Sequence, residues 1–336
     1  MSSSETPQAT PVPELSVVLV AGSGAPGIAR TMHHLRAQTA RRRMEVLIVA
    51  ESAAGFDLAA LGGDLAACRI MEVGPITERG AAAAIGLLAA TSPVVGLIED
   101  HSYPAPEWAE ALLRAHAGGW SGVGPAVDNA NPESAASWVN YILGYGGFAP
   151  PVDAGARDLI PWHNSAYKRD AIAPFGDRLG ALLEWEGALQ SELRARGHTL
   201  YLEPAARTAH GNVSRIWSTV GLNVQRGRAL GALRAERERW PAWRRAVQAA
   251  AFTLFPLLQL RHLVPSMRRL PVPSSLKPRV YLGLGVTLGV LAAAEAWGLL
   301  AGVGDAISRL EDYELHRRRH LSPRDRETSA ATAAVS

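Results

Sequence analysis

The sequence predicts an α/β protein with a mainly parallel sheet, helices on both faces, and apolar helices near the C-terminus. Short runs rich in Val, Ile and Leu recur at 15–20, 45–50, 69–73, 94–98, 121–127 and 199–202. Stretches with helical character lie between them, at about 27–40, 79–91, 107–117 and 186–197. Strands that are apolar throughout and alternate with helices are typical of parallel sheets covered on both faces.

Length and composition limit the alternatives. With 336 residues, 48% of them hydrophobic, the chain can build one large core and an appendage. Cys68 is the only cysteine, which excludes an intrachain disulfide and zinc sites made of several cysteines. The net charge of +3 is modest, and we expect no nucleic-acid partner. Residues 1–13 lack the features of a signal peptide, so we expect a disordered leader there and a disordered tail at 317–336.

Two apolar stretches, 246–260 and 280–304, dominate the segment 241–316. The second is long enough to span a bilayer, for which about 20 residues suffice, whereas Pro256 interrupts the first. Arginines flank both stretches on every side, and the positive-inside rule would keep all these flanks in the cytosol. Helices lying in the membrane interface, or a re-entrant pair, therefore fit better than two crossings, on the cytoplasmic face of the cell membrane. A soluble helical subdomain packed on the sheet is the alternative.

A glycine-rich loop, "AGSGAPG" at 21–27, follows the first predicted strand. Gly22, Gly24 and Gly27 match G-x-G-x-x-G, and Glu51 ends the next strand, which outlines a dinucleotide-binding site. Glycines after a first strand are common in α/β proteins. An NAD-dependent oxidoreductase therefore stays open as one interpretation.

The apolar run "VVGLI" ends abruptly in Glu99, Asp100 and His101. In open α/β sheets, ligands lie beyond the carboxyl ends of the strands. Carboxylates at such an end can hold a divalent cation that neutralises a departing nucleotide diphosphate. The plainer interpretation is a solvated strand end with a structural histidine.

A pair of acids, Glu184 and Glu186, precedes the last predicted helix of the sheet region. Either can act as a general base for an attacking hydroxyl, or can simply be favoured near a helix N-terminus. His210 follows the next strand, where it could close a metal site with Asp100 or lie in a surface loop.

The segment "IPWHNSAYKRDAI" at 160–172 places Trp162, His163 and Asn164 in a predicted loop. Aromatic and amide groups of this kind suit sugar recognition. Ordinary packing of the tryptophan is the alternative.

In order along the chain, these pieces resemble a family 2 glycosyltransferase with the GT-A fold, of the membrane-associated bacterial type. The resemblance runs from about Leu15 to about Arg234, within a domain placed at 14–240. "LSVVLVAG" and "RTMHHLRAQT" are similar to the family's first strand and helix, and "EVLIVAES" to its second strand. "ERGAAAAIGLLAATSPVVGLIEDH" resembles the helix and strand that end in its Asp-x-Asp-type motif. "NSAYKRDAI", "WEGALQSELRARG" and "EPAARTAH" resemble its acceptor-side segment, its catalytic helix and its histidine-bearing strand end.

The resemblance implies a role for each matching residue. Glu51 would contact the nucleobase, Glu99 the donor ribose, and Asp100 a divalent metal, Mg²⁺ or Mn²⁺, with His101 and His210 as further metal ligands. Glu186 would be the base, with Glu184 in reserve. The donor-binding set is Ala21, Gly22, Glu51, Arg79, Glu99 and Asp100, and the acceptor-binding set is Trp162, His163 and Asn164.

The implied activity is transfer of a sugar, as by a hexosyltransferase, from a nucleotide-diphosphate sugar to a hydroxyl acceptor. The transfer would be metal-assisted and would invert the configuration at the anomeric carbon. The membrane-associated helices make a lipid-linked or envelope glycan acceptor plausible, as in cell-envelope polysaccharide biosynthesis. The motif reads Glu-Asp-His rather than a run of aspartates, and Trp162 stands where the family often has glycine, so a catalytically inactive, membrane-attached scaffold also stays open.

Overall fold

The computed structural model describes residues 12–185, 187–252, 256, 261, 263 and 267–326. The longer strands lie close to the predicted runs, with the bounds Leu15–Val20 (β1), Met44–Ala50 (β2), Ala67–Glu72 (β3), Val94–Ile98 (β4), Gly122–Asn129 (β6) and Leu200–His210 (β9). The last of these continues well beyond the predicted end at 202. Three short strands have no sequence signal of their own: Ser102–Pro104 (β5), Gly155–Arg157 (β7) and Ala166–Lys168 (β8).

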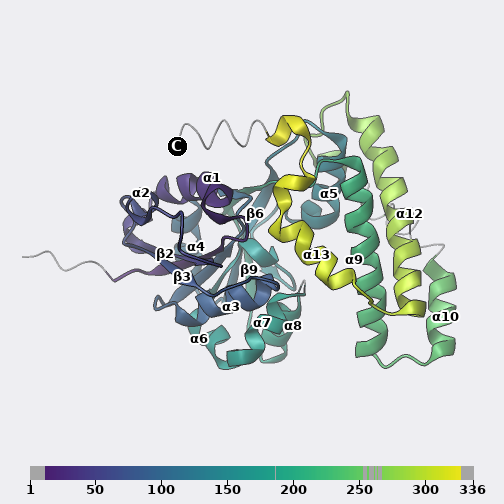
Figure 1. Ribbon diagram of the computed structural model, residues 1–336, viewed down its shortest axis with the longest axis horizontal. Helices are drawn as coiled ribbons and strands as arrows, with labels where there is room; N and C mark the ends of the chain where they lie inside the picture. The colour runs from purple at the N-terminus through teal and green to yellow at the C-terminus, as the bar shows by residue number, and fades with distance from the viewer. Residues whose placement is uncertain are drawn as a thin grey trace, which may run out of the picture.

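These strands form one mainly parallel sheet with the order β3-β2-β1-β4-β8-β6-β9-β5, and β7 pairs with β9. The first four strands in this order are parallel, and so are β6 and β9. Strand β8 joins the two groups by antiparallel pairing with β4 and β6. Figure 1 shows helices on both sides of the sheet, so the predicted α/β class is confirmed.

Helices occupy the four predicted intervals of the sheet region, at Gly24–Arg36 (α1), Arg79–Ala89 (α3), Trp108–His116 (α4) and Ala188–Ala195 (α8). Helices that were not predicted are Leu58–Gly62 (α2), Ala135–Tyr145 (α5), Arg169–Ile172 (α6) and Leu179–Leu183 (α7). Short 3-10 turns lie at Arg41–Arg43 (η1), Gly146–Phe148 (η2), Trp162–Asn164 (η3) and Ala173–Arg178 (η4).

The central strands are apolar throughout because each of their faces is covered by a different set of helices. Val18 of β1 belongs to a buried cluster with Leu87 of α3, whereas Val17 and Leu19 belong to a second cluster with Met32 of α1. Successive side chains of a strand point to opposite faces. A strand buried on both faces therefore needs an unbroken apolar run, which is the pattern seen in the sequence.

Two long helices, Ile216–Arg237 (α9) and Lys277–Ala301 (α12), lie side by side next to the sheet region, with Ala242–Ala251 (α10) beyond them (Figure 1). Their backbones can approach closely because Gly298 has no Cβ. A Cβ at this position would collide with the carbonyl oxygen of Arg228. Among the described residues, α12 is the one helix long and apolar enough to cross a membrane, with a mean hydropathy of 1.7. Its apolar window is nevertheless 44% buried, against α9 and α5.

After α12 the chain turns back toward the sheet. Helix Ala306–Leu315 (α13) lies between α9 and the sheet region (Figure 1), and the 3-10 turn Arg317–His320 (η6) follows. Residues 317–326 fall in the stretch expected to be a disordered tail, but here they have defined contacts. Arg317, Leu321 and Asp325 are buried, and Asp325 accepts a hydrogen bond from Asn131.

The close contact between α9 and α12 predicts opposite effects for two glycine substitutions on α12. Gly298→Ala should lower the free energy of unfolding by about 1–3 kcal/mol, because the added methyl meets backbone that cannot yield. Gly289→Ala, where a Cβ would meet nothing within 4 Å, should leave stability unchanged or raise it by up to about 1 kcal/mol. Chemical denaturation of both variants measures the difference. Equal effects would contradict the packing.

Candidate functional site

The candidate site lies at the carboxyl edge of the sheet, where two strands bring three predicted residues together. Strand β4 ends at Ile98 and is followed at once by Glu99, Asp100 and His101. The chain then enters β5, which pairs with the end of β9 so that Ser102 lies opposite His210. This pairing places His101 beside His210, 109 residues further along the chain.

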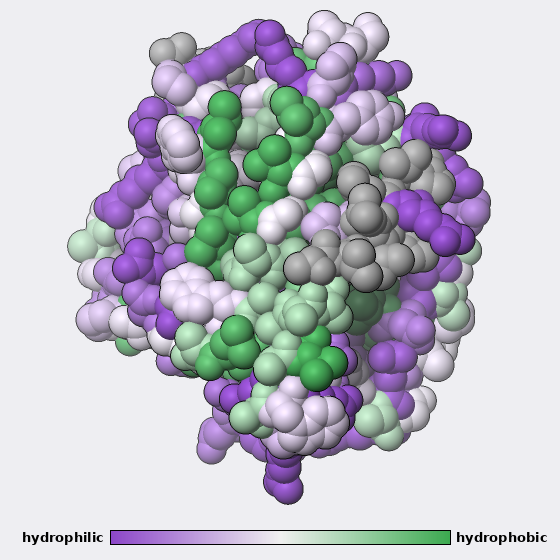
Figure 2. All heavy atoms as spheres, turned by 90° about the vertical axis from the view of Figure 1, so that its right-hand side faces the viewer, coloured by the Kyte–Doolittle hydropathy of each residue, from purple (hydrophilic) through white to green (hydrophobic). Residues whose placement is uncertain are grey.

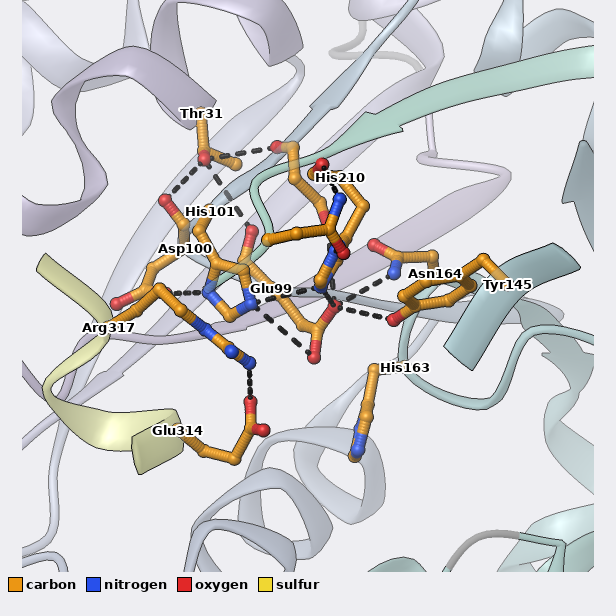
Figure 3. Close-up of polar contacts among 12 residues, drawn as sticks. Thr31, Glu99, Asp100, His101, Tyr145, His163, Asn164, His210, Glu314 and Arg317 are labelled. Carbon is orange, nitrogen blue, oxygen red and sulfur yellow. Dashed lines mark hydrogen bonds and ion pairs between the residues drawn. The ribbon is translucent and has the colours of Figure 1, made fainter. Parts of the chain in front are cut away.

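Glu99, His101 and His210 form a buried cluster that could hold a metal ion, since one ligand atom from each lies within 4.8 Å of the others. The two Nε2 atoms are 3.1 Å apart, and His210 Nε2 is 3.3 Å from Glu99 Oε2 (Figure 3). The sequence predicted Asp100, not Glu99, as the carboxylate of this set. Here the Asp100 side chain turns to the other nitrogen of its neighbour, with Asp100 Oδ1 2.7 Å from His101 Nδ1.

Hydrogen bonds fix the orientation of both imidazoles. Asn212 Oδ1 lies 2.9 Å from His210 Nδ1, and the Asn212 amide cannot be reversed because its Nδ2 donates to Asn129 Oδ1 and to the carbonyl of His210. The oxygens of Asp100 and Asn212 are acceptors, so each imidazole Nδ1 must carry a proton. Histidines that ligate metals are commonly held in this way.

The consequence is that two neutral imidazoles would point their Nε2 lone pairs at one another and at a carboxylate. Such an arrangement is repulsive unless a proton or a cation lies between the ligand atoms. Two imidazole nitrogens and one carboxylate oxygen are a common ligand set for divalent transition metals.

Glu99 is ionised in this setting. Burial alone would raise its pKa, but positive charge on the imidazoles of His101 and His210, as when a proton lies between them, holds the pKa of Glu99 well below its ordinary value. Three donors from other elements also reach its carboxylate: Asn164 Nδ2 at 2.9 Å, Tyr145 Oη at 3.3 Å and Arg79 Nη1 at 3.3 Å.

Helix α1 holds the loop that carries the cluster. The hydroxyl of Thr31 lies 2.8 Å from the carbonyl oxygen of Asp100 and 3.1 Å from that of Ser102 (Figure 3). Sequence reasoning missed both Thr31 and Asn212. Thr31 gives no signal inside a helix, and the only hint for Asn212 is its place two residues after His210.

The predicted donor-binding residues share the same edge. Ala21 and Gly22 follow β1, Glu51 follows β2 and accepts a hydrogen bond from the N–H of Ile76, and Arg79 begins α3. A small cavity of about 30 Å³ lies among Gly22, Arg79, Glu99 and Asp100, and two residues of the C-terminal segment, Glu314 and Leu315, also line it.

The predicted acceptor-binding residues flank the cluster on its other side. Asn164 is fully buried and donates to Glu99, and His163 Nε2 lies 2.7 Å from Arg79 Nη2. Burial and then Arg79 lower the pKa of His163 well below its ordinary value, so the neutral ring accepts from the guanidinium. Trp162 and His163 line a larger cavity of about 150 Å³ that reaches α9 and α13.

The two predicted catalytic acids have different outcomes. Glu184 Oε1 accepts hydrogen bonds from the N–H groups of Gly80 and Ala81, at 2.7 and 3.2 Å, so it caps the N-terminus of α3. A carboxylate engaged in this way is poorly placed to take a proton from an acceptor. Glu186 lies outside the described residues, and its role as base stays a prediction.

Neither a known protein-family model nor a curated protein sequence matches this chain. Among solved structures, GalNAc-T7 with UDP, GalNAc and Mn²⁺ is similar over 59% of this chain and 44% of that chain, at 15% identity and a TM-score of 0.44. This chain thus spans less than half of that one. The mannosyltransferase PcManGT from Pyrobaculum calidifontis, in complex with GDP-Man and Mn²⁺, is similar over 99% of this chain and 89% of that chain, at 18% identity and a TM-score of 0.45. At these values the likeness carries no argument on activity, which has to be inferred from the site itself.

One carboxyl group beside the site makes stability depend on pH. Burial raises the pKa of Glu311 to about 7 from an ordinary 4.5, with Glu184 adding to the shift and Arg79 opposing it. Between these two values the folded state keeps a proton that the unfolded state has lost, so stability should fall as pH rises through this window. Glu311→Gln cannot titrate and should flatten this part of the profile. Unfolding midpoints at about pH 5 and about pH 7.5 test it.

A matched control is Glu78→Gln, on an exposed residue next to α3 whose side chain makes no capping hydrogen bond. It should keep the pH dependence of the unmodified protein. An unchanged slope in Glu311→Gln would show that another group titrates.

Proposed function

We propose that this chain is a metal-dependent glycosyltransferase that transfers a sugar from a nucleotide-diphosphate sugar to a hydroxyl acceptor. The observation that carries the proposal is the buried Glu99–His101–His210 cluster, in which the two Nε2 atoms lie 3.1 Å apart. It lies at the carboxyl edge of a parallel sheet, where α/β proteins bind their ligands. The sequence resemblance to family 2 glycosyltransferases, which implies a donor diphosphate at the same edge, supports the proposal.

Glu99, His101 and His210 would hold the metal, and Asp100 and Asn212 would keep the two imidazoles in the ligating tautomer. Mg²⁺ prefers a shell of oxygen ligands, so of the two expected ions the transition ion Mn²⁺ fits a set with two imidazoles better. When bound, the metal supplies charge neutralisation to the departing diphosphate.

The residues of the chain have separate tasks in this proposal. Arg79, between Glu99 and His163, presents a positive charge at the donor edge, where a diphosphate can accept its hydrogen bonds. Glu186 is our proposed base for the acceptor hydroxyl, a contribution of about 10²–10⁴-fold to the rate. Attack from the face opposite the diphosphate would invert the anomeric carbon, as the family 2 resemblance implies.

The larger cavity indicates the chemistry of the acceptor. It begins at Glu99 and His210, passes Trp162, and continues between apolar side chains of α9 and α13, among them Leu222, Leu230, Ile307 and Leu310. A hydroxyl acceptor with an apolar portion fits such a path. This supports a lipid-linked acceptor, as in the synthesis of an envelope glycan.

The C-terminal helices support attachment to the cytoplasmic face of the cell membrane. Figure 2 shows apolar side chains gathered on the side where α10 and α12 lie, and we call this the apolar face. Its exposed residues are Leu282, Val286 and Leu300 of α12 and Trp243 and Val247 of α10. We propose that α12 lies on the bilayer rather than across it, because its other side packs on α9, where Arg234 forms an ion pair of 2.6 Å with the buried Glu295.

Nucleotide binding tests the proposed function. UDP, GDP, dTDP and NAD are titrated by calorimetry into the full chain, without metal and with Mn²⁺ or Mg²⁺. We expect one nucleoside diphosphate to bind in the presence of Mn²⁺, with His210→Ala abolishing the metal-dependent part. Asn212→Ala should weaken Mn²⁺ binding by about 10–100-fold, because it frees the His210 ring.

His198→Ala is the matched control, because His198 precedes β9 at the opposite edge of the sheet and should not affect binding. NAD binding that ignores the metal would overturn the proposal in favour of an oxidoreductase at Gly22, Gly24 and Gly27. Normal diphosphate binding without donor hydrolysis or transfer would favour the inactive scaffold.

Membrane attachment has its own test, by co-sedimentation with phosphatidylcholine vesicles with and without phosphatidylglycerol. The unmodified chain should sediment with the anionic vesicles. Leu282→Glu with Val286→Glu should reduce binding by about tenfold or more, because two exposed apolar side chains are lost from the apolar face. Leu58→Glu, on the exposed side of α2, is the control. Equal sedimentation of the double variant would contradict this orientation.

A further inference from the structure

We propose that helix α13 closes the donor site, so that this helix must move away before a nucleotide sugar can bind. The inference rests on the proposed function, since it takes the edge between Gly22 and Glu99 as the donor site. It concerns a segment far from that edge in sequence, which no motif singled out.

The end of α13 lies directly on the glycine loop after β1. A Cβ at Gly22 would lie 2.6 Å from Leu315 Cδ2, and Ser23 Oγ donates a 2.7 Å hydrogen bond to the carbonyl oxygen of Leu315. The cavity left between Gly22, Glu99 and Leu315 has a volume of about 30 Å³. Pockets for small ligands typically have about 300–1,000 Å³, so a nucleotide sugar does not fit while α13 is in place.

Two acidic side chains of α13 occupy the positions that would attract a diphosphate. Glu311 Oε2 accepts a 3.0 Å hydrogen bond from the N–H of Arg79, at the N-terminus of α3. Glu314 lines both cavities with Arg79 and pairs with Arg317. A helix N-terminus and a guanidinium both favour anions. The acidic side chains of α13 therefore occupy the place at the donor edge where phosphate groups would bind.

The connection to α12 can serve as a hinge. Gly302 and Gly304 join the two helices with φ values of +79° and +52°, which glycine adopts without strain. The small and the large cavity share Arg79, Glu99, His163 and Glu314 in their walls. Moving α13 would therefore join them into one space that reaches from Gly22 to the acceptor side.

A reversible disulfide tests whether α13 has to move. Gly22→Cys with Leu315→Cys is made in a Cys68→Ser background, where no other thiol remains. A Cβ at position 22 lies 3.4 Å from Leu315 Cβ, close to the roughly 3.5–4.5 Å of natural disulfides. The diphosphate that binds best with Mn²⁺ is titrated before oxidation with diamide, after it, and after reduction. We expect oxidation to abolish binding and reduction to restore it.

Leu315→Ala tests the same idea without altering Gly22. It removes the side-chain contact between Leu315 and the glycine loop and so favours the state in which α13 has moved away. Because this binding-competent state becomes more populated, the apparent Kd for the diphosphate should fall by about tenfold. Leu58→Ala, exposed on α2, should leave Kd unchanged.

The outcomes separate the two proposals. Equal binding by the oxidised and reduced forms, or an unchanged Kd in Leu315→Ala, overturns closure by α13 and leaves the glycosyltransferase standing. No metal-dependent diphosphate binding by any folded variant, including the released Leu315→Ala, overturns the proposed function itself.

Discussion

The arrangement of the site depends on one buried carboxylate, that of Glu99. It is contacted from α3 by Arg79, from α5 by Tyr145, from η3 by Asn164 and from β9 by His210. Burying an ionised carboxylate costs several kcal/mol unless its oxygens are paired, so these contacts have to form together. Because each partner comes from a different element, Glu99 fixes how helices and strands meet at the carboxyl edge.

Around this carboxylate, acidic groups outnumber the arginines. Arg79 lies among Glu99, Glu184, Glu311 and Glu314. Burial would raise the pKa of Glu314, but Arg317 and Arg79 hold it at about 2, so this acid stays ionised beside Glu99. A site that concentrates buried negative charge in this way favours a cation between its ligands. Because of this excess, we expect a diphosphate to replace α13 only when a cation binds with it.

The sequence predicts the sheet well and the site only in part. Strands β1 and β4 match their predicted bounds, because burial on both faces leaves an unmistakable apolar run. The sequence also drew attention to the acids and the histidine at this strand end, but it could not tell which of two adjacent acids, Glu99 or Asp100, faces His210. That choice depends on loop geometry, which Thr31 sets from another element. The contact between Ser23 and Leu315 spans 292 positions and has no local signature at all.

The helix pair α9–α12 links the two surfaces that the proposed reaction needs. Helix α9 contributes Leu222 and Leu230 to the wall of the larger cavity. Helix α12, on the other side of the pair, carries much of the apolar face. Glycines bring the two backbones into contact, so these helices pack tightly against each other. In the proposed orientation, an acceptor with an apolar portion would enter along the apolar face, which we propose rests on the bilayer. The donor would enter from the water side, past Gly22, where the position of α13 controls access.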